Sequence, residues 1–243
     1  MAEQDRWGIV YSPQFSLTNT HKRWNLIRKH LQLRGVQYDF VQSESSRSVG
    51  RLATMRCNNG YHTIVVVGND ASLNDAVNAM MNCKDKLPDD FAFGVIPNGT
   101  GNDFARFWCD DVRDYAGIID AIINRKVKKI DVALCVYHDD GIPQRRYFIN
   151  CMNAGLGAKL VKTSIEAAQI IGMSKLTFFI TLIRRVFERS QFDVALQIDT
   201  ERPSGTYMSM CIGNCHGYGQ TPNAVPYNGM LDVSLITRPQ WWQ

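Results

Sequence analysis

Two short segments of the chain combine glycine and asparagine with small hydroxyl and carboxylate side chains. They read Gly68-Asn69-Asp70-Ala71-Ser72-Leu73-Asn74 and Asn98-Gly99-Thr100-Gly101-Asn102-Asp103. Each segment follows an apolar run directly and precedes a helical pattern. Glycine lets the backbone turn tightly and approach a ligand, and the free amides at the start of a helix attract phosphate. Hydroxyls on Ser72 and Thr100 would add donors, so the two segments predict a site for the phosphates of a nucleotide.

Either segment alone is explained equally well as an ordinary turn in which Asn, Asp and Ser cap the next helix. The two segments occur in succession, however, separated by a single helix and a single strand. Ligands of open parallel sheets bind where the strands end, and both segments follow strands. Their combination therefore favours the phosphate site over two unrelated turns.

The elements around these segments alternate between strands and helices. Apolar runs predict strands over residues 8–11, 36–41, 63–67 and 91–96. Helical spacing predicts helices from Thr20 to a stop at Gly35, over 49–57, over 72–82, and from 103 to about 124. This alternation predicts an α/β fold, with a doubly wound, mostly parallel sheet and helices on both of its faces. We expect this nucleotide-binding domain to occupy residues 1–127.

Residues 128–243 follow a different pattern, which predicts a second domain rich in antiparallel strands. Strands are expected over 130–137, 146–151, 192–198, 207–212 and 231–236, with one long helical stretch over 164–189. The part of that stretch from 175 to 189 has apolar residues along one side and basic residues elsewhere. It suits either a helix that covers the sheet or a basic amphipathic helix on an anionic membrane.

The composition is that of a globular protein, with 45% hydrophobic and 21% charged residues. A net charge of only +4, without a basic stripe interleaved with aromatic residues, argues against nucleic acid as a partner. The chain begins without the pattern of a signal peptide, and its most apolar run is far shorter than the roughly 18 residues of a membrane span. Seven scattered cysteines without a CxxC pair indicate a reducing compartment. We therefore expect a cytoplasmic protein, at most peripheral to the inner face of the membrane.

The second segment and its flanks, Gly94 to Trp108, read GVIPNGTGNDFARFW. This run resembles the PxGTGNDFAR segment of the diacylglycerol kinase-like lipid kinases, a family that includes sphingosine kinases and bacterial lipid kinases. The first segment is similar to the family's GGDGTLNE segment. Weaker similarities follow at residues 129–131, 150–157 and 229–233, so the resemblance extends over most of the chain.

The resemblance implies that the γ-phosphate of ATP is transferred, with Mg²⁺, to the hydroxyl of a lipid such as diacylglycerol at a membrane surface. It implies a nucleotide domain related to phosphofructokinases, whose relatives often associate, so a homodimer is expected. Asp70 matches the aspartate that is assigned as the base in sphingosine kinase-like members. The nucleotide is expected to contact Ser12, Gly68, Asn69, Asp70, Ala71, Ser72, Asn74, Asn98, Gly99, Thr100, Gly101, Asn102, Asp103 and Arg106.

The sequence departs from the family pattern at three places. In the first segment Asn69 and Ala71 stand where the family has glycines, and Ser72 stands where it has threonine. Asn69 can still adopt a left-handed backbone and Ser72 keeps a hydroxyl, but the methyl group of Ala71 disfavours positive φ and occupies space near a phosphate. Asn228 replaces the aspartate that bacterial members are thought to use as the base, and losing a general base typically slows a reaction by about 10²- to 10⁴-fold. The chain also stops at Gln243, so the β-rich domain for the lipid, residues 128–243, is expected to be shortened.

Two alternatives stay open beside a lipid kinase. One is a catalytically weak or silent nucleotide-binding protein with a regulatory role, which Ala71 and Asn228 favour. The other is an NAD kinase-like enzyme, which shares a Gly-Gly-Asp type of loop, although the GTGNDFAR run argues against it. The role of Arg106 is open too, because its guanidinium either reaches a phosphate or pairs with Asp103 or Asp110.

Overall fold

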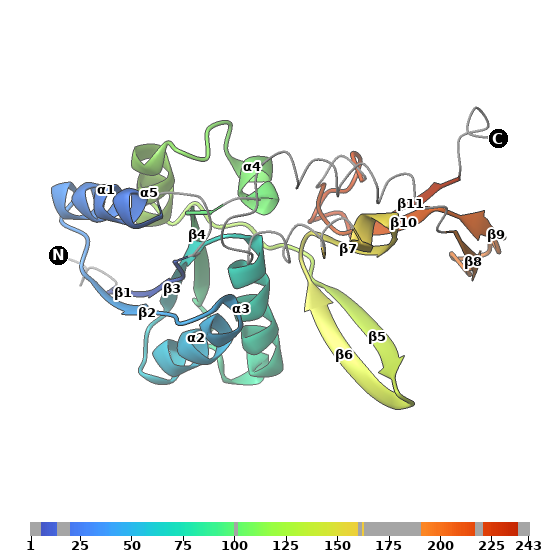
Figure 1. Ribbon diagram of the computed structural model, residues 1–243. Coiled ribbons are helices and arrows are strands. Elements are labelled where there is room, and N and C mark those ends of the chain that lie inside the picture. The colour runs from blue at the N-terminus through green and yellow to red at the C-terminus, as the bar shows by residue number, and fades with distance from the viewer. Residues whose placement is uncertain are drawn as a thin grey trace, which may run out of the picture. The chain divides into compact units, whose positions relative to one another are not determined.

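The computed structural model describes residues 6–13, 20–99, 102–159, 162, 191–216 and 221–237. Figure 1 shows the elements that these residues form. The helices are α1 (Thr20–Leu33), α2 (Val49–Asn58), α3 (Asp70–Asn82), α4 (Asp103–Trp108) and α5 (Tyr115–Ile123), with 3₁₀ turns η1 (Ser46–Ser48) and η2 (Lys84–Lys86). The strands are β1 (Trp7–Tyr11), β2 (Tyr38–Gln42), β3 (Thr63–Gly68), β4 (Ala92–Pro97), β5 (Ala133–Asp139), β6 (Ile142–Phe148), β7 (Cys151–Gly155), β8 (Phe192–Ala195), β9 (Ser204–Tyr207), β10 (Ser209–Gly213) and β11 (Asp232–Ile236).

The first four strands form one parallel sheet in the order β2-β1-β3-β4. The two central strands consist of the apolar runs expected from the sequence, because a strand covered on both faces is apolar along its whole length. All residues of β1 and of β3 are buried. The prediction of an α/β fold with a parallel sheet is confirmed.

Alternate residues of the strands fill two separate cores, one on each face of the sheet. Ile9 and Val65 pack on one face with residues of α1 and α5. Val10 and Ile64, their neighbours in sequence, pack on the other face with residues of α2 and α3. Figure 1 shows the two pairs of helices on opposite sides of the sheet. The arrangement follows from the strand geometry, since successive side chains of a strand point to opposite faces.

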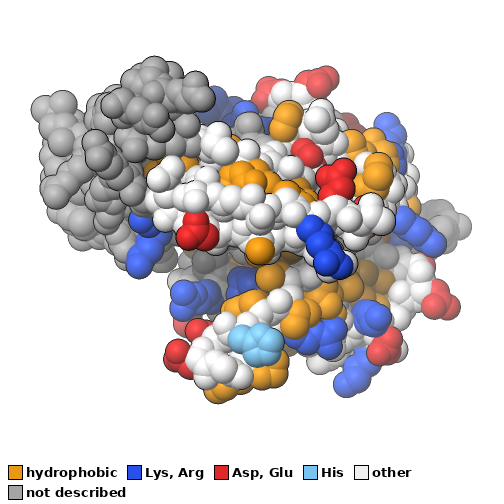
Figure 2. All heavy atoms as spheres, turned by 90° about the vertical axis from the view of Figure 1, so that its right-hand side faces the viewer, with side chains coloured by type: hydrophobic (Ala, Val, Ile, Leu, Met, Phe, Trp, Pro, Cys, Tyr) orange, Lys and Arg blue, Asp and Glu red, His pale blue; other side chains and the backbone are white. Residues whose placement is uncertain are grey.

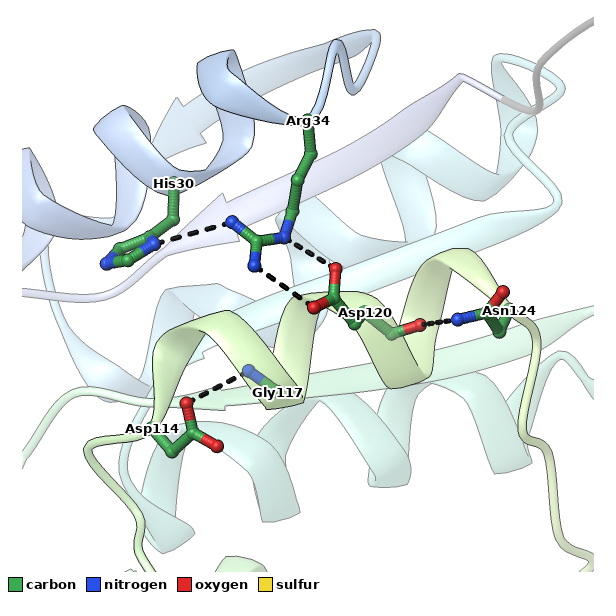
Figure 3. A network of polar contacts seen from close by, with 6 residues as sticks. All are labelled: His30, Arg34, Asp114, Gly117, Asp120 and Asn124. Atoms are coloured by element: carbon green, nitrogen blue, oxygen red, sulfur yellow. Dashed lines mark hydrogen bonds and ion pairs between the residues drawn. The ribbon is translucent and has the colours of Figure 1, made fainter.

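An ion pair joins α5 to the residue that follows α1 (Figure 3). The guanidinium of Arg34 donates from Nε to Oδ1 of Asp120 at 2.5 Å and from Nη2 to Oδ2 at 3.0 Å. This bidentate bond lowers the pKa of Asp120. The next residue, Gly35, has a φ of +65° and ends the first helix as the sequence predicted. Because the pair is at the surface, it orients the two helices more than it stabilises them.

The described strands after residue 130 all pair in antiparallel fashion, as the sequence predicted. β5 and β6 form one hairpin, β8 and β9 form another, and the remaining three form a sheet in the order β11-β10-β7. The single strand expected over 146–151 is wrong, because β6 ends at Phe148 and β7 begins at Cys151. Asp140 and Gly141 at the tip of the first hairpin have φ values of 48° and 79°. Two positive φ values in succession fit a two-residue hairpin turn.

The chain divides into two compact units. The first comprises Met1–Asn150 with Val225–Gly229, and the second comprises Cys151–Ala224 with Met230–Gln243. The hairpin of β5 and β6 belongs to the first unit because Asn78 of α3 binds the backbone of Tyr147. Nδ2 of Asn78 donates to the carbonyl of Tyr147 at 2.8 Å, and its Oδ1 accepts the amide of Tyr147 at 2.8 Å. The domain boundary expected near residue 128 stays a prediction.

The helical stretch expected over 164–189 lies outside the described residues, as do residues 238–243 at the end of the chain. Within the ranges that the structure describes, no helix is both long and apolar enough to cross a membrane. The seven cysteines all lie within the described ranges, and none of them forms a disulfide bond.

We expect Leu31→Ala to lower the free energy of unfolding by about 2 to 5 kcal/mol, because it leaves a cavity between α1 and the sheet. Leu31 is fully buried, whereas Leu33 on the same helix is 71% exposed. Urea denaturation followed by tryptophan fluorescence measures the change, since Trp24 belongs to the same core. Leu33→Ala is the matched control, and equal losses in the two variants would contradict the packing of α1.

Candidate functional site

The carboxyl ends of the four parallel strands carry a row of small polar residues. Ser12 follows β1, Ser43 follows β2, Asn69 follows β3 and Asn98 follows β4. From β1 the chain continues to β2 on one side, and it then crosses to β3 and β4 on the other side of β1. The strand order therefore switches between β1 and β3. Ligands of open α/β sheets bind outside the carboxyl ends of the strands at such a switch point. The first predicted segment and Ser12 therefore lie where this fold favours a ligand.

Sequence reasoning did not single out Ser43, which is buried at one end of this row. Its amide donates to the carbonyl of Tyr11 at 2.8 Å, which holds it beside β1. A weak signal was present in the sequence, because Ser43 lies two residues after the strand expected over 36–41.

The turn after β3 is shaped by side chains of Asn69, Ser72 and Ser12. Oδ1 of Asn69 accepts the backbone amide of Ser72 at 3.1 Å and the hydroxyl of Ser72 at 2.9 Å. The hydroxyl oxygens of Ser72 and Ser12 lie 2.8 Å apart. A Cβ atom on Gly68 would lie 3.0 Å from Cβ of Ser72 and 3.3 Å from Cβ of Ser12. Glycine is thus needed at this position because the two serines approach so closely.

The backbone of Asn69 and Ala71 takes ordinary conformations. Asn69 is extended, with a φ of −107° and a ψ of −178°, and Ala71 is the second residue of α3. Neither residue uses the left-handed conformation that glycine favours. The objection that Ala71 disfavours positive φ therefore does not apply to this turn.

The two predicted turns lie side by side at the same edge of the sheet. β3 and β4 pair in parallel with Gly68 opposite Pro97, and the amide of Asn98 donates to the carbonyl of Gly68 at 2.8 Å. Parallel pairing brings the ends of both strands to one edge. This juxtaposition is what a phosphate chain shared by the two turns requires.

Buried oxygen atoms without a protein partner occur in and beside the second turn. They are Oδ1 of Asn98, Oδ1 of Asn102 and Oδ2 of Asp103, each without a hydrogen bond from any described residue. Nδ2 of Asn102 donates to the carbonyl of Gly99 at 2.9 Å, which ties the two ends of the turn together. Residues 100–101, between these two ends, lie outside the described residues. Buried polar atoms are nearly always hydrogen-bonded, so such atoms indicate a place for a polar ligand.

The carboxylate of Asp70 connects the first turn to the second. Its Oδ2 accepts the amide of Asp103 at 2.8 Å, and its Oδ1 accepts the amide of Phe104 at 3.3 Å. These are the first two residues of α4, where a negative charge is favourable. Since these two amides donate to Asp70, a phosphate at the second turn must be held by other donors.

Burial raises the pKa of Asp70 from its ordinary value of 3.8 to about 6. Hydrogen bonds from the amides of Asp103 and Phe104 and from the side chain of Asn150 lower this pKa, but desolvation outweighs them. A carboxylate offers about four lone-pair positions, so Asp70 keeps the capacity to accept a further proton. Strongly shifted carboxylates of this kind cluster at functional sites.

Asn150 reaches Asp70 because the strand before it is anchored on α3. The side chain of Asn78 binds both the amide and the carbonyl of Tyr147, which lies three residues before Asn150. Sequence reasoning gave no role to either asparagine. No local signal could have shown one, because Asn78 and Tyr147 are 69 positions apart.

The turn at Asn228 belongs to the same compact unit as Asp70. The amide of Gly229 donates to Oδ2 of Asp131 at 2.7 Å, and the amide of Asp131 donates to the carbonyl of Pro226 at 2.8 Å. Two weakly matching stretches, 98 positions apart, are therefore joined in the structure.

The other predicted residues lie around the two turns. The carbonyl of Asn74 accepts Nδ2 of Asn78 at 2.7 Å, which fixes the second turn of α3. Arg106 is exposed on α4. It forms no ion pair with Asp103 or Asp110, all three of which the structure describes.

These observations define a doubly wound α/β unit with two Gly- and Asn-containing turns at the carboxyl ends of its neighbouring strands β3 and β4, followed by a unit of antiparallel strands. A family model for the diacylglycerol kinase catalytic domain matches residues 6–135, more than half of the chain. The chain belongs to the diacylglycerol kinase-like lipid kinase family.

Relatives of known name support this assignment. A protein of Shewanella frigidimarina named "Probable lipid kinase YegS-like" is 27% identical over 90% of this chain and 68% of its own length. A diacylglycerol kinase of Staphylococcus epidermidis is 28% identical over 73% of this chain and 51% of its own length. The crystal structure of a diacylglycerol kinase from Bacillus anthracis has the same fold, with a TM-score of 0.66 and 18% identity over 96% of this chain and 74% of that one. The chain spans between half and about two thirds of the length of these curated relatives.

The raised pKa of Asp70 makes the stability of the first unit depend on pH. The pKa of about 6 in the folded protein lies above the ordinary 3.8. The stability that Asp70 contributes is therefore present in full below pH 3.8 and is lost as the pH rises through about 6. Asp70→Asn removes this titration. The free energy of unfolding of the wild type relative to Asp70→Asn is expected to fall by on the order of 2 kcal/mol from about pH 4.5 to about pH 8.

Urea denaturation of both proteins at a series of pH values measures this difference. A difference that stays constant over the whole range would show that Asp70 is not desolvated.

Proposed function

We propose that the protein transfers the γ-phosphoryl group of ATP to the hydroxyl of a lipid, with diacylglycerol as the substrate class. The observation that carries the proposal is the partly buried carboxylate of Asp70, which accepts the amide of Asp103 and has a pKa of about 6. A general base works best when its pKa lies near the working pH. Membership of the lipid kinase family supports a lipid alcohol as the acceptor.

In the proposed reaction the lipid oxygen forms a bond to the γ-phosphorus while the bond from that phosphorus to the bridging oxygen of ADP breaks. The hydroxyl proton passes to Asp70, and ADP and the phosphorylated lipid leave. Phosphoryl transfer depends mostly on positioning and on the stabilisation of charge. The hydrogen bonds from Asp103, Phe104 and Asn150 would keep the accepting carboxylate in one orientation.

The residues present fit both ATP and Mg²⁺. Ser12 and Ser43 would place hydroxyl donors at the ends of β1 and β2, where phosphate oxygens would lie, whereas the hydroxyl of Ser72 already donates within the first turn. The oxygens of Asn98, Asn102 and Asp103 that lack partners are of the hard type that Mg²⁺ takes as ligands. Mg²⁺, when bound, would neutralise charge on the phosphates.

The magnesium ion would need ligands beyond these side chains. Across the described ranges of the chain, His, Cys, Asp and Glu form no group of three that could hold a metal ion. Mg²⁺ is usually held by one or two carboxylates together with substrate phosphates and water. We therefore expect it to bind with the nucleotide rather than before it. The homodimer and the cytoplasmic location stay predictions.

Asp70→Asn should lower kcat/KM for ATP-dependent phosphorylation of diacylglycerol by about 10²- to 10⁴-fold, because asparagine cannot accept the proton. The wild-type rate should also fall as the pH drops below about 6, where Asp70 becomes protonated. Transfer of radiolabelled phosphate from ATP to phosphatidic acid measures both effects. Asp85→Asn, at an exposed carboxylate in η2, is the control. Unchanged activity in Asp70→Asn would sink the assignment.

The second candidate function is a nucleotide-binding protein without turnover, and Asn228 is the residue that favours it. The family resemblance implies that an aspartate here would act as a base in bacterial members. We expect Asn228→Asp to raise the rate of phosphate transfer by about tenfold or more, because it supplies a second proton acceptor. If calorimetry shows ATP binding while both wild type and Asn228→Asp leave every lipid unmodified, the silent protein is the better description.

A further inference from the structure

Aromatic rings and a lysine form one group in the first unit, with Trp108, Tyr227 and the lysine exposed. Its members are Phe107 and Trp108 at the end of α4, Lys128 after α5, and Tyr227; we call them the aromatic–lysine patch. Ring centroids lie 4.9 Å apart for Phe107 and Trp108, 6.1 Å for Phe107 and Tyr227, and 6.0 Å for Trp108 and Tyr227. Nζ of Lys128 lies 3.4 Å from the centroid of Tyr227 and 5.8 Å from that of Trp108. Three separate stretches of the chain thus meet in one cluster.

The patch is open to water although its rings are large. Trp108 is 40% exposed, Tyr227 is 44% exposed, and the neighbouring Val127 is 69% exposed. Single exposed apolar side chains are ordinary, and the face drawn in Figure 2 shows several among Lys and Arg side chains. A cluster of three aromatic rings with an ammonium group over two of them is a more unusual surface feature than a single exposed apolar side chain. Trp and Tyr have an apolar body and a polar end, which suits a boundary between water and an apolar phase.

The charge around the patch is positive. Residues 123–129 read INRKVKK and contain four basic residues and no acidic one. Lys126, Lys128 and Lys129 are exposed, whereas Arg125 is bound to the hydroxyl of Thr63 and the carbonyl of Asp90. The stretch 106–114 has two arginines and three aspartates, a net charge of −1 against the four basic residues of 123–129. The lysines therefore set the sign of the field around the rings.

The patch borders the proposed active site along the chain. α4 begins at Asp103, whose amide binds Asp70, and ends at Trp108. A helix rises about 1.5 Å per residue, so less than two turns separate the two points. Tyr227 directly precedes Asn228. A surface that touched these rings would be held close to both motifs.

We propose that the aromatic–lysine patch docks the protein on an anionic lipid bilayer. Trp108 and Tyr227 would lie at the level of the lipid headgroups, and Lys126, Lys128 and Lys129 would contact their phosphates. The docking proposal rests on the proposed function in one respect, because docking would serve to bring a lipid substrate to the site. Docking itself needs neither ATP nor turnover.

Sedimentation with vesicles tests the proposal on the full chain without ATP. We expect binding to vesicles of phosphatidylcholine mixed with phosphatidylglycerol, weaker binding in high salt, and little binding to phosphatidylcholine alone. Lys128→Gln should lower the partition coefficient about fivefold, the equivalent of one basic residue near an anionic surface. The double variant Lys128→Gln/Tyr227→Ser should lower the partition coefficient about tenfold or more relative to the wild type.

Arg28→Gln is the matched control, because Arg28 also lies over an exposed ring, that of Phe40 at 5.6 Å. Equal losses in Arg28→Gln and Lys128→Gln would overturn the proposal, as would failure of the wild type to bind anionic vesicles. A second measurement needs no disruptive variant. Brominated lipids should quench the fluorescence of the wild type more than that of Trp108→Phe, and equal quenching would place the contact elsewhere. Vesicle binding by a protein that phosphorylates no lipid would sink the proposed function and leave the docking surface intact.

Discussion

The partly buried carboxylate of Asp70 is the group on which the rest of the candidate site depends. It accepts the first two amides of α4 and receives the side chain of Asn150, so it holds three parts of the chain at once. Its desolvation opposes the charged form, as the raised pKa shows. A carboxylate kept in this condition contributes less to stability at neutral pH than a neutral group of the same shape would. A carboxylate that costs stability in this way is expected at a functional site, where a proton acceptor is needed, rather than at a position whose only role is to cap the start of a helix.

The register of the parallel sheet is what allows one carboxylate to reach both turns. Gly68 lies opposite Pro97, so the residues that follow the two strands start from the same edge. The close approach of Ser12 and Ser72 over Gly68 then draws β1 and α3 together at the switch point. The cores on the two faces fix this register, since a slip by one residue would send Ile9 and Val10 to the wrong sides.

The sequence alone predicted the features that depend on local pattern. The apolar runs identified the parallel strands, Gly35 ended the first helix, and the strand-to-helix turns lie where the sequence placed them. The hairpin turn at Asp140 and Gly141 carried a local signal that was not used, namely an Asp-Gly pair between two strands. The strand expected over 146–151 was wrong, because β6 ends at Phe148 and a new strand begins only at Cys151, after Ile149 and Asn150.

Contacts between distant residues could not be predicted in the same way. Asn78 docks Tyr147 and so places Asn150 beside Asp70, and each step joins elements about 70 positions apart or more. The sequence placed Asn150 in a stretch that resembles the family, without showing what its side chain binds. Asp131 and Gly229 are a further case, because their bond brings the late turn into the first unit. The sequence therefore indicated which residue types could bind a ligand or accept a proton, but not which of them contact one another in the folded chain.

The structure also separates the two substitutions that raised the question of activity. At the first turn the loss of the family's glycines is compensated locally, because Asn69 caps α3 with its side chain and Ala71 takes a helical conformation. The shape of this turn is set by hydrogen bonds among Asn69, Ser72 and Ser12 instead of by the freedom of glycine. Asn228 is different in kind, since no change of conformation turns an amide into a proton acceptor. Of the two carboxylates that the family pattern expects at Asp70 and at position 228, the chain therefore keeps only the first.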